Sequence, residues 1–555
     1  MLRVALLAPA IAFALAPHVR AGAQDAARSH DATGVILGES GDLDGAIAAF
    51  REAMASDPTL AVARFHLGLA LERTSRPDEA LAAYKQALRL DPRLLEARFG
   101  LSSVCAAVGD LDGAISMLQQ VAMAMPDLAE ARYNLGVNLW NRYKSAQGPR
   151  QRADLDAALD ELKTAVRLAP SQAHVHAALG RLLADRQDLD GAVTHLKQAR
   201  ELEPNRSEHA YDLGLALRLA GDLEGAAAEL RAALAADPAH GLARRALGLV
   251  RRTTGDLQGA ASDFRAAVAA VPMDPQAHQL LGSTLLKVGD TAAGLEALHR
   301  AIELDPELVE ARVTLAQALA RAGRSEEARR QQTEIQRLYA TKADVSRAMI
   351  LVETAADLLR SGDAEGAASR LREATGLAPM FAEAHYQLAR ALRQASAAPS
   401  EVEGPLSRVL QLNPRHAGAY HELGLVQRRH DQAAAYHAFR RATELAPGLV
   451  PAHRFLAELA AVRQDWPTVI TSLEGVIAWE PQDGPAHLAL GQALSRQRSW
   501  AEALVTLRTA VTLEPDSAEA HYALAEALAA SGATDEASRA FAAARRLDPT
   551  VGQPR

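Results

Sequence analysis

The chain has 555 residues, of which 49% are hydrophobic, 4% aromatic and 23% charged, and its formal net charge at pH 7 is −8. An alanine-rich, aromatic-poor composition suits closely packed helices, and the length would accommodate three or four ordinary domains. No basic block of the nucleic-acid-binding kind is present, so we expect no nucleic-acid partner. The single cysteine, Cys105, excludes an internal disulfide, and its apolar neighbours predict a buried structural thiol.

Residues 1–23 have the pattern of a secretory signal peptide. Arg3 provides the positive charge, residues 4–16 are apolar, and residues 21–23 are a small-x-small cleavage site. The apolar run is short for a membrane span. We therefore expect a mature chain that begins at Gln24, lies in the periplasm or is secreted, and has no membrane span after cleavage. Retention of the segment as an uncleaved anchor is the alternative.

Prolines recur at a nearly fixed interval along the rest of the chain. Most intervals are 34 residues, with one of 44 and one of 73. A 34-residue period of two helices predicts about fifteen helix-turn-helix units between residues 25 and 549. The prolines that define the period are Pro58, Pro92, Pro126, Pro170, Pro204, Pro238, Pro272, Pro306, Pro379, Pro414, Pro447, Pro481, Pro515 and Pro549.

The turn inside each unit has its own recurring motif. Asp-Leu-Asp-Gly-Ala occupies 110–114 and recurs at 42–46 and 188–192, with looser copies at 222–226 and 256–260. A glycine precedes most copies, and it predicts a left-handed residue that ends one helix. The first aspartate predicts an N-cap for the next helix, where its carboxylate accepts free backbone N–H groups.

Small and large residues also recur at one phase of the period. Ten residues after Pro58 stands Gly68, a leucine precedes it, and the second helix carries Ala80 followed by Tyr84. The same pattern returns in most units. Small residues let the paired helices approach closely, and a large residue fills the hollow beside them. One such pair cannot bury its apolar face alone, so the units must stack.

These positions resemble those of the tetratricopeptide repeat family, and the chain is similar to exported bacterial members. The resemblance implies an all-α, right-handed superhelical solenoid of about fifteen repeats that acts as a non-catalytic scaffold for protein–protein interaction. We expect a signal peptide (1–23), an array of about nine repeats (24–340), an irregular joint (341–405), a second array (406–549) and a tail (550–555).

Two stretches depart from the repeat pattern. The fourth unit carries ten extra residues near 141–154, and a basic loop there could contact an acidic partner; the alternative is a solvated turn. The joint lacks its proline and gains five residues between Tyr339 and Val345, and Pro399 and Pro405 stand where a second helix should run, so we expect that helix to be degraded. The basic residues of the loop are Arg142, Lys144, Arg150 and Arg152.

Histidine recurs at one repeat position, but a shared metal would need ligands that converge at about 2 Å on one ion. Equivalent positions of stacked helix pairs lie about 10 Å apart, so we expect packing and no metal site. No nucleotide-binding or nucleophile motif is present, so we expect no cofactor and no catalytic residue. Trp466 and Trp500 share a phase with core leucines and are expected in the core. The recurring histidines are His176, His278, His385, His453, His487 and His521.

The resemblance implies that the first helices of the units line a concave face that grips peptides or partner helices. Aromatic residues beside carboxylates on that face could hold a peptide of basic or apolar character. The alternative is that these rings brace adjacent units. The matching positions are Phe65, Phe99, Tyr133, Tyr211, Tyr386 and Tyr522, with acids three residues before several of them, including Glu96 and Glu130.

The expected function is a scaffold that binds peptide segments or partner helices and is not an enzyme. Two alternatives stay open: a scaffold subunit of a polysaccharide secretion or outer-membrane assembly machine, and a non-catalytic subunit of, or adaptor to, an envelope enzyme. The identity of the partner, the pathway and the oligomeric state do not follow from the sequence.

We predict that the native protein begins at Gln24 and is found outside the cytoplasm, because residues 1–23 follow the order of a cleavable signal. N-terminal sequencing of protein from fractionated cells measures this. A chain that still begins with Met1 and is recovered from the cytosol would contradict the prediction.

Overall fold

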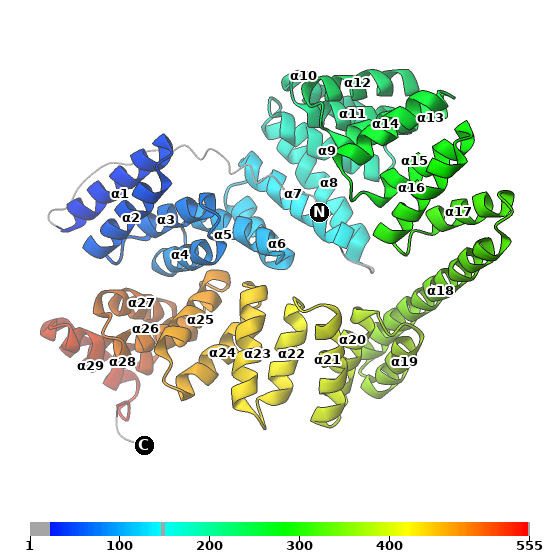
Figure 1. Cartoon of the computed structure of the whole chain (residues 1–555). Coiled ribbons are helices and arrows are strands. Elements are labelled where there is room, and N and C mark those ends of the chain that lie inside the picture. The colour runs from blue at the N-terminus through cyan, green and yellow to red at the C-terminus, as the bar shows by residue number, and fades with distance from the viewer. Residues whose placement is uncertain (1–22, 146–149, 553–555) are drawn as a thin grey trace. The chain divides into compact units, whose positions relative to one another are not determined.

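The computed structural model describes residues 23–145 and 150–552, and over these ranges the chain forms 29 α-helices and no β-strand (Figure 1). The predicted signal peptide, apart from residue 23, lies outside the described residues. The helices form two compact units, which are described separately below. Unit 1 contains the residues up to Arg142 and those from His385 onward, and unit 2 runs from Tyr143 to Ala384.

Unit 1 joins the first helices of the chain to the last ones. α7 and α20 carry the chain out of this unit and back into it. The helices of unit 1 are α1 (Ala23–Ser40), α2 (Leu43–Ser56), α3 (Ala61–Arg73), α4 (Pro77–Leu90), α5 (Leu95–Val108), α6 (Leu111–Ala124), most of α7 (Ala129–Ser145), most of α20 (Ala382–Gln394), α21 (Pro399–Leu412), α22 (Ala417–Gln427), α23 (Gln432–Leu445), α24 (Val450–Val462), α25 (Trp466–Trp479), α26 (Gly484–Arg496), α27 (Trp500–Leu513), α28 (Ala518–Ala530) and α29 (Thr534–Leu547).

Unit 2 is one uninterrupted run of helices, each packed on the next along the chain. Its helices are α8 (Arg150–Leu168), α9 (Ala173–Asp185), α10 (Leu189–Leu202), α11 (Ser207–Ala220), α12 (Leu223–Ala236), α13 (Gly241–Thr253), α14 (Leu257–Ala270), α15 (Pro275–Val288), α16 (Thr291–Leu304), α17 (Val309–Arg321), α18 (Ser325–Ser361) and α19 (Ala364–Leu377).

The recurring turn motif is a helix-to-helix joint, as the sequence predicts. Gly109 ends α5 with a φ of 93°, a conformation that favours glycine. Asp110 then caps α6, and its carboxylate accepts a hydrogen bond of 2.9 Å from the backbone N–H of Gly113. Gly113 must be small, because a Cβ there would lie 2.5 Å from the capping carboxylate. The other copies of the motif repeat this capping bond.

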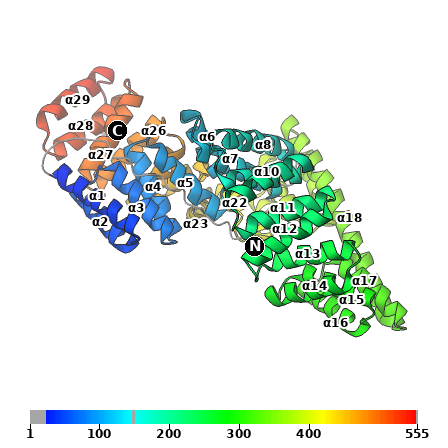
Figure 2. The ribbon, with the colours of Figure 1, turned by 90° about the horizontal axis from the view of Figure 1, so that it is seen from above.

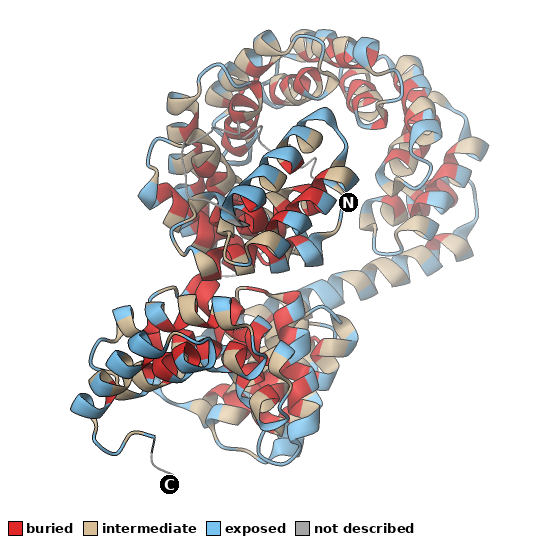
Figure 3. Cartoon of the chain, turned by 90° about the vertical axis from the view of Figure 1, so that its left-hand side faces the viewer, coloured by how far each residue is buried: buried red, intermediate tan, exposed pale blue. Residues whose placement is uncertain are grey.

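Helix pairing follows the small–large pattern. A Cβ added to Gly68 on α3 would lie 2.5 Å from the ring of Tyr84 on α4, and one added to Gly180 would lie 2.6 Å from Leu196. Tyr84 is fully buried in this position. Figure 3 shows that the buried residues lie on the sides where helices meet. The close approach of paired helices is therefore set by glycine on one helix and a large side chain on the other.

The missing proline at the joint has a structural consequence. With no proline to stop it, the second helix of one pair continues into the first helix of the next, and both form the single 37-residue helix α18. The 29 helices therefore amount to fifteen pairs, which confirms the all-α helical-repeat solenoid. No residue between Ala328 and Ala348 on this helix is buried.

The expected degradation of the helix at Pro399 and Pro405 is wrong. α21 runs from Pro399 to Leu412, and Pro399 occupies the first turn, where its missing N–H costs nothing. Pro405 lies inside the helix and removes one backbone hydrogen bond. The helix persists because Val402, Leu406 and Val409 share one face and are at most 1% exposed.

Segment 341–405, the expected joint, contains the end of α18, all of α19 and α20, and the start of α21, and one of the two boundaries between the units falls inside it. We predict that a low dose of trypsin cuts first in the unburied part of α18, because few side-chain contacts hold that stretch. Sodium dodecyl sulfate gels with mass spectrometry of the early fragments identify the cut.

The internal control for this digestion is Arg300 on α16, which is 47% exposed and lies on a helix packed against both neighbours. It should be cut later than the unburied part of α18. First cuts within α9–α16 would show that the long helix is as stable as the repeats around it.

Candidate binding surfaces

The predicted concave aromatic residues of the first units are not open to a partner. Phe65 is 5% exposed and Phe99 is 7% exposed. The ring of Phe65 lies 6.2 Å from that of Tyr84 and 5.3 Å from that of His66, so it is part of the core between α3 and α4. Phe65 and Phe99 therefore brace the helices. The expectation that they lie on an accessible concave face is wrong, because their rings are buried.

The four later aromatic residues are half-buried. Tyr211 and Tyr386 each cover the turn that follows the helix pair of their own unit, and Tyr522 covers the end of the described chain. Tyr211 lies 4.9 Å from the ring of His240, and Tyr386 lies 4.6 Å from the ring of His416. Tyr522 packs on Gly552, where an added Cβ would overlap its ring. Tyr133 is half-buried as well. Bracing of adjacent segments, the alternative interpretation, accounts for the contacts of the three.

The charged candidates are spread over the surface. Glu96 is exposed and Glu130 is half-buried. In unit 1, Arg142 forms an ion pair of 2.6 Å with Asp112. Lys144 is exposed at the end of α7. Arg150 and Arg152 begin α8, but their side chains lie outside the described part of the structure, so an acidic partner for this loop stays a prediction.

The histidine row has a shared structural role. At five of these positions the imidazole Nε2 donates to the carbonyl oxygen of the proline six residues earlier, at 3.0 to 3.1 Å, and His385 is not assigned either way. Arginines at the same position of other units, such as Arg98 and Arg312, donate to the same carbonyl. The bond ties the inter-unit turn to the first helix of the next unit. The histidines that form it are His176, His278, His453, His487 and His521.

Burial keeps the most enclosed members of the row neutral. Desolvation lowers the pKa of His487 below its ordinary value of 6.5, although the proline carbonyl and Asp483 favour the charged form. Burial also places the pKa of His453 well below 6.5, with the charge of Lys85 acting in the same direction. Among the described residues, no three His, Cys, Asp or Glu side chains lie close enough to hold a metal ion.

Unit 1 contains a groove with a volume of about 780 Å³, outside these packing contacts. The first helices of the last three units, α24, α26 and α28, form most of it, and residues from α25 and the first residue of α27 complete its wall. We call it the alanine groove after the eight alanines that line it. They are Ala457, Ala461, Ala486, Ala489, Ala493, Ala523, Ala527 and Ala530.

Two tryptophans and several charges complete the alanine groove. Trp466 and Trp500, which were expected in the core, are half-buried and line the groove. Trp466 also packs against the core with part of its surface. Arg454 lies at the rim and is held by Asp483 at 2.6 Å and by Glu480. Further polar groups on the lining are Glu458, Gln492, Arg496 and Glu526.

Sequence reasoning missed the alanine groove for an identifiable reason. Trp466 and Trp500 share the phase of Leu111 and Leu189, and those leucines are themselves only half-buried, so this repeat position is not a core position. Their recurrence 34 residues apart, beside alanines on the preceding helices, was the available signal. Cys105, by contrast, is fully buried as expected, and burial raises the pKa of its thiol.

The geometry defines the chain as a helical-repeat solenoid, and comparison with protein families specifies which one. Two tetratricopeptide repeat models match more than half of the chain. The chain therefore belongs to the tetratricopeptide repeat family, whose members are generally non-catalytic scaffolds for protein–protein interaction. The matched ranges are 32–94, 143–207, 177–240, 211–277 and 353–417 for one model and 73–135, 285–349 and 494–553 for the other.

Solved structures similar to the chain are themselves tetratricopeptide repeat proteins. The thermophilic protein TTC0263 of Thermus thermophilus is 26% identical, with a TM-score of 0.30 over 34% of this chain and 98% of that one. YrrB, described as having an unusual peptide-binding site, is 24% identical, with a TM-score of 0.29 over 35% and 95%. A protein from Parabacteroides merdae is 16% identical, with a TM-score of 0.37 over 47% and 99%. No curated protein matches the chain.

Within the described residues, no helix is both long and apolar enough to cross a membrane. This includes α18, whose 37 residues carry many charged side chains.

We predict that His487→Ala destabilises unit 1 by about 2–3 kcal/mol, because it removes a partly buried hydrogen bond and the packing of a fully buried ring. The matched control is His521→Ala, which removes the same bond where it is exposed and should cost about 1 kcal/mol or less. Urea titration followed by circular dichroism measures both.

The same pair tests the protonation state. The pKa of His487 is lower in the folded protein than its ordinary value of 6.5 in the unfolded chain. The unfolded chain therefore binds the proton more readily, and acidification below pH 6.5 destabilises the folded state. The His487→Ala variant should lose this part of the pH dependence. An equal loss of stability in both variants, or stoichiometric zinc binding by the unmodified protein, would contradict the packing role.

Proposed function

We propose that the chain is an exported, non-catalytic scaffold that holds a peptide segment or helix of a partner protein in the alanine groove. The observation that carries the proposal is the combination of a cavity of about 780 Å³, a lining of alanines and two half-buried tryptophans. Membership of the tetratricopeptide repeat family supports a protein as the class of partner.

The lining indicates what the partner must supply. Alanines leave space that larger apolar side chains of a ligand can fill, and burial of such side chains is the main source of peptide affinity. Trp466 and Trp500 offer flat apolar surface at low entropic cost. Because Arg454 is already paired with Asp483 and Glu480, the remaining rim charges, including Glu458 and Glu526, are available to fix the orientation of a peptide.

Export rests on the sequence of residues 1–23 and would place the partner in the cell envelope or outside the cell. A role in a polysaccharide secretion or outer-membrane assembly machine would be a special case of this proposal, in which the bound segment belongs to a component of that machine.

The proposal is tested with peptides selected from a displayed random library against the full chain. We predict that Ala489→Trp weakens the selected peptides at least about tenfold, because an indole on the half-buried lining of the groove occupies the space of the ligand. Isothermal titration with the synthetic peptides measures the dissociation constant.

The matched control is Ala55→Trp, which adds the same indole at an exposed position of α2 and should leave the affinity unchanged. Trp500→Ala should also weaken binding while circular dichroism stays helical. Equal affinity of the Ala489→Trp and Ala55→Trp variants would place the binding site elsewhere, and a library that yields no peptide would contradict a peptide ligand.

A further inference from the structure

Helices from the two ends of the chain contact each other inside unit 1. α4 packs against α25 and α27, and one apolar core cluster includes residues from Ala46 to Met117 and from Ala435 to Ala503. Both Figure 1 and Figure 2 show α4 beside α27. In a solenoid each unit contacts only its neighbours along the chain, so this contact is an addition to the repeat architecture.

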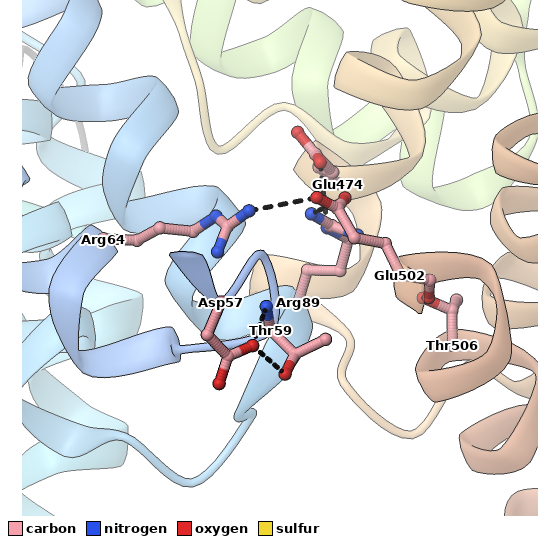
Figure 4. A network of polar contacts seen from close by, with 7 residues as sticks. All are labelled: Asp57, Thr59, Arg64, Arg89, Glu474, Glu502 and Thr506. Carbon is pink, nitrogen blue, oxygen red and sulfur yellow. Dashed lines mark hydrogen bonds and ion pairs between the residues drawn. The ribbon is translucent and has the colours of Figure 1, made fainter. Parts of the chain in front are cut away.

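The contact is built around four charged side chains (Figure 4). Arg64 of α3 donates to Glu502 of α27 at 3.0 Å, across 438 residues of sequence. Arg89 of α4 donates to the other oxygen of Glu502 at 2.6 Å, and its Nε lies 2.9 Å from a carboxylate oxygen of Glu474 on α25. Arg64, Arg89 and Glu474 are at most 4% exposed. Two positive and two negative charges therefore meet in an interface where three of the side chains are buried and that of Glu502 is 18% exposed.

Arg64 is an exception to the pattern of its own repeat position. Arg98, Arg132 and Arg312 at that position donate to the carbonyl of the proline six residues earlier. Arg64 instead donates to Glu502, on a helix from the other end of the chain. The Arg64 side chain therefore joins distant segments of the chain, whereas the other three arginines bond to the turn just before their own helix.

A second polar contact reinforces the first. The carboxylate of Asp110 caps α6 with one oxygen, and its other oxygen accepts a 2.7 Å hydrogen bond from the N–H of Gly448 in the turn before α24. A Cβ on Gly448 would lie 2.8 Å from the Cα of Gly113, so the two turns meet backbone to backbone. Nearby, the ammonium of Lys85 lies 5.9 Å from the ring of Trp479, and burial lowers the pKa of Lys85 to about 8.

We propose that α3 and α4 form a docking surface for α25 and α27 of the same chain, and that this charged interface opens and closes as a unit while the repeats on either side stay folded. We call the interface, with its residues Arg64, Arg89, Glu474 and Glu502, the clasp. Charge complementarity identifies α25 and α27 as the segments that bind the surface of α3 and α4, because two arginines on one side face two glutamates on the other.

The repeats on either side can outlast the clasp because their own packing is larger. α4 packs more extensively on α3 and α5 than on α25 or α27, and α25 packs more extensively on α24 and α26 than on α4. The clasp itself is sensitive, since a buried ion cluster gives little net stability when complete and is strongly unfavourable when one member is removed. Loss of one charge should therefore open the clasp before it unfolds a repeat.

The test measures a distance in the full chain. Cysteines introduced at the exposed positions Ala55 on α2 and Ala529 on α28 carry spin labels, while the fully buried Cys105 stays unlabelled. Double electron–electron resonance should show one narrow distance in the parent protein. Arg89→Met, which leaves Glu474 buried without its partner, should raise the ratio of open to closed molecules at least about a hundredfold.

Two variants make the result specific. Arg76→Met removes an exposed arginine from the start of the same helix and should leave the distance unchanged. Replacing the whole clasp by apolar residues (Arg64→Met, Arg89→Met, Glu474→Leu and Glu502→Leu) should restore the closed distance, because no buried charge is left unpaired. If Arg89→Met loses helical circular dichroism, Glu502→Gln, which keeps the shape of the side chain, replaces it and should open the clasp to a smaller extent.

Three outcomes would overturn the proposal. A broad distance distribution in the parent protein would show that the clasp does not form. An unchanged distance in both Arg89→Met and Glu502→Gln would show that the charges do not hold it. Loss of the short distance when labelled chains are diluted about tenfold with unlabelled ones would show that the occupant is a second copy of the chain.

Discussion

The close approach of paired helices is the constraint on which the rest of the structure depends. A Cβ added to Gly68 would lie 2.5 Å from the ring of Tyr84, so a larger residue there would require the ring or one of the two helices to shift. This spacing recurs from pair to pair and lets each pair present the same shape to the next, so the solenoid grows by repetition. Departures from the repeat are absorbed locally: a missing proline lengthens α18, and Pro405 is tolerated inside α21 because three apolar side chains still pack.

Polar side chains connect the repeats where apolar packing cannot. The histidines and arginines that reach a proline carbonyl tie each turn to the following helix, and the capping aspartates close the turn within each pair. Unit 1 uses the same residue types for a different purpose. Arg64 and Asp110 occupy repeat positions, yet both contact residues that are hundreds of positions away in the sequence. The repeat position therefore determines where on a helix a side chain is attached, and the surrounding helices determine which partner it contacts.

The groove and the clasp share helices. On α25, Leu473 lines the alanine groove and the adjacent Glu474 pairs with Arg89. On α27, Trp500 lines the groove and Glu502 pairs with Arg89. Adjacent residues on a helix point about 100° apart, so one helix can serve two surfaces. A ligand in the groove and the charges in the clasp thus act on the same two helices, which are held in place from both sides.

The sequence by itself determined the repeat length, the fifteen pairs, the capping turns and the burial of Cys105, because each depends on residues close together in the chain. It did not determine the partners of side chains at equivalent positions. Phe65 and Phe99 are buried, and Trp466 and Trp500 line a groove, because their surroundings include helices from other units. The contact of α4 with α25 and α27 was decided only by the tertiary structure, since no local pattern records which distant surfaces meet.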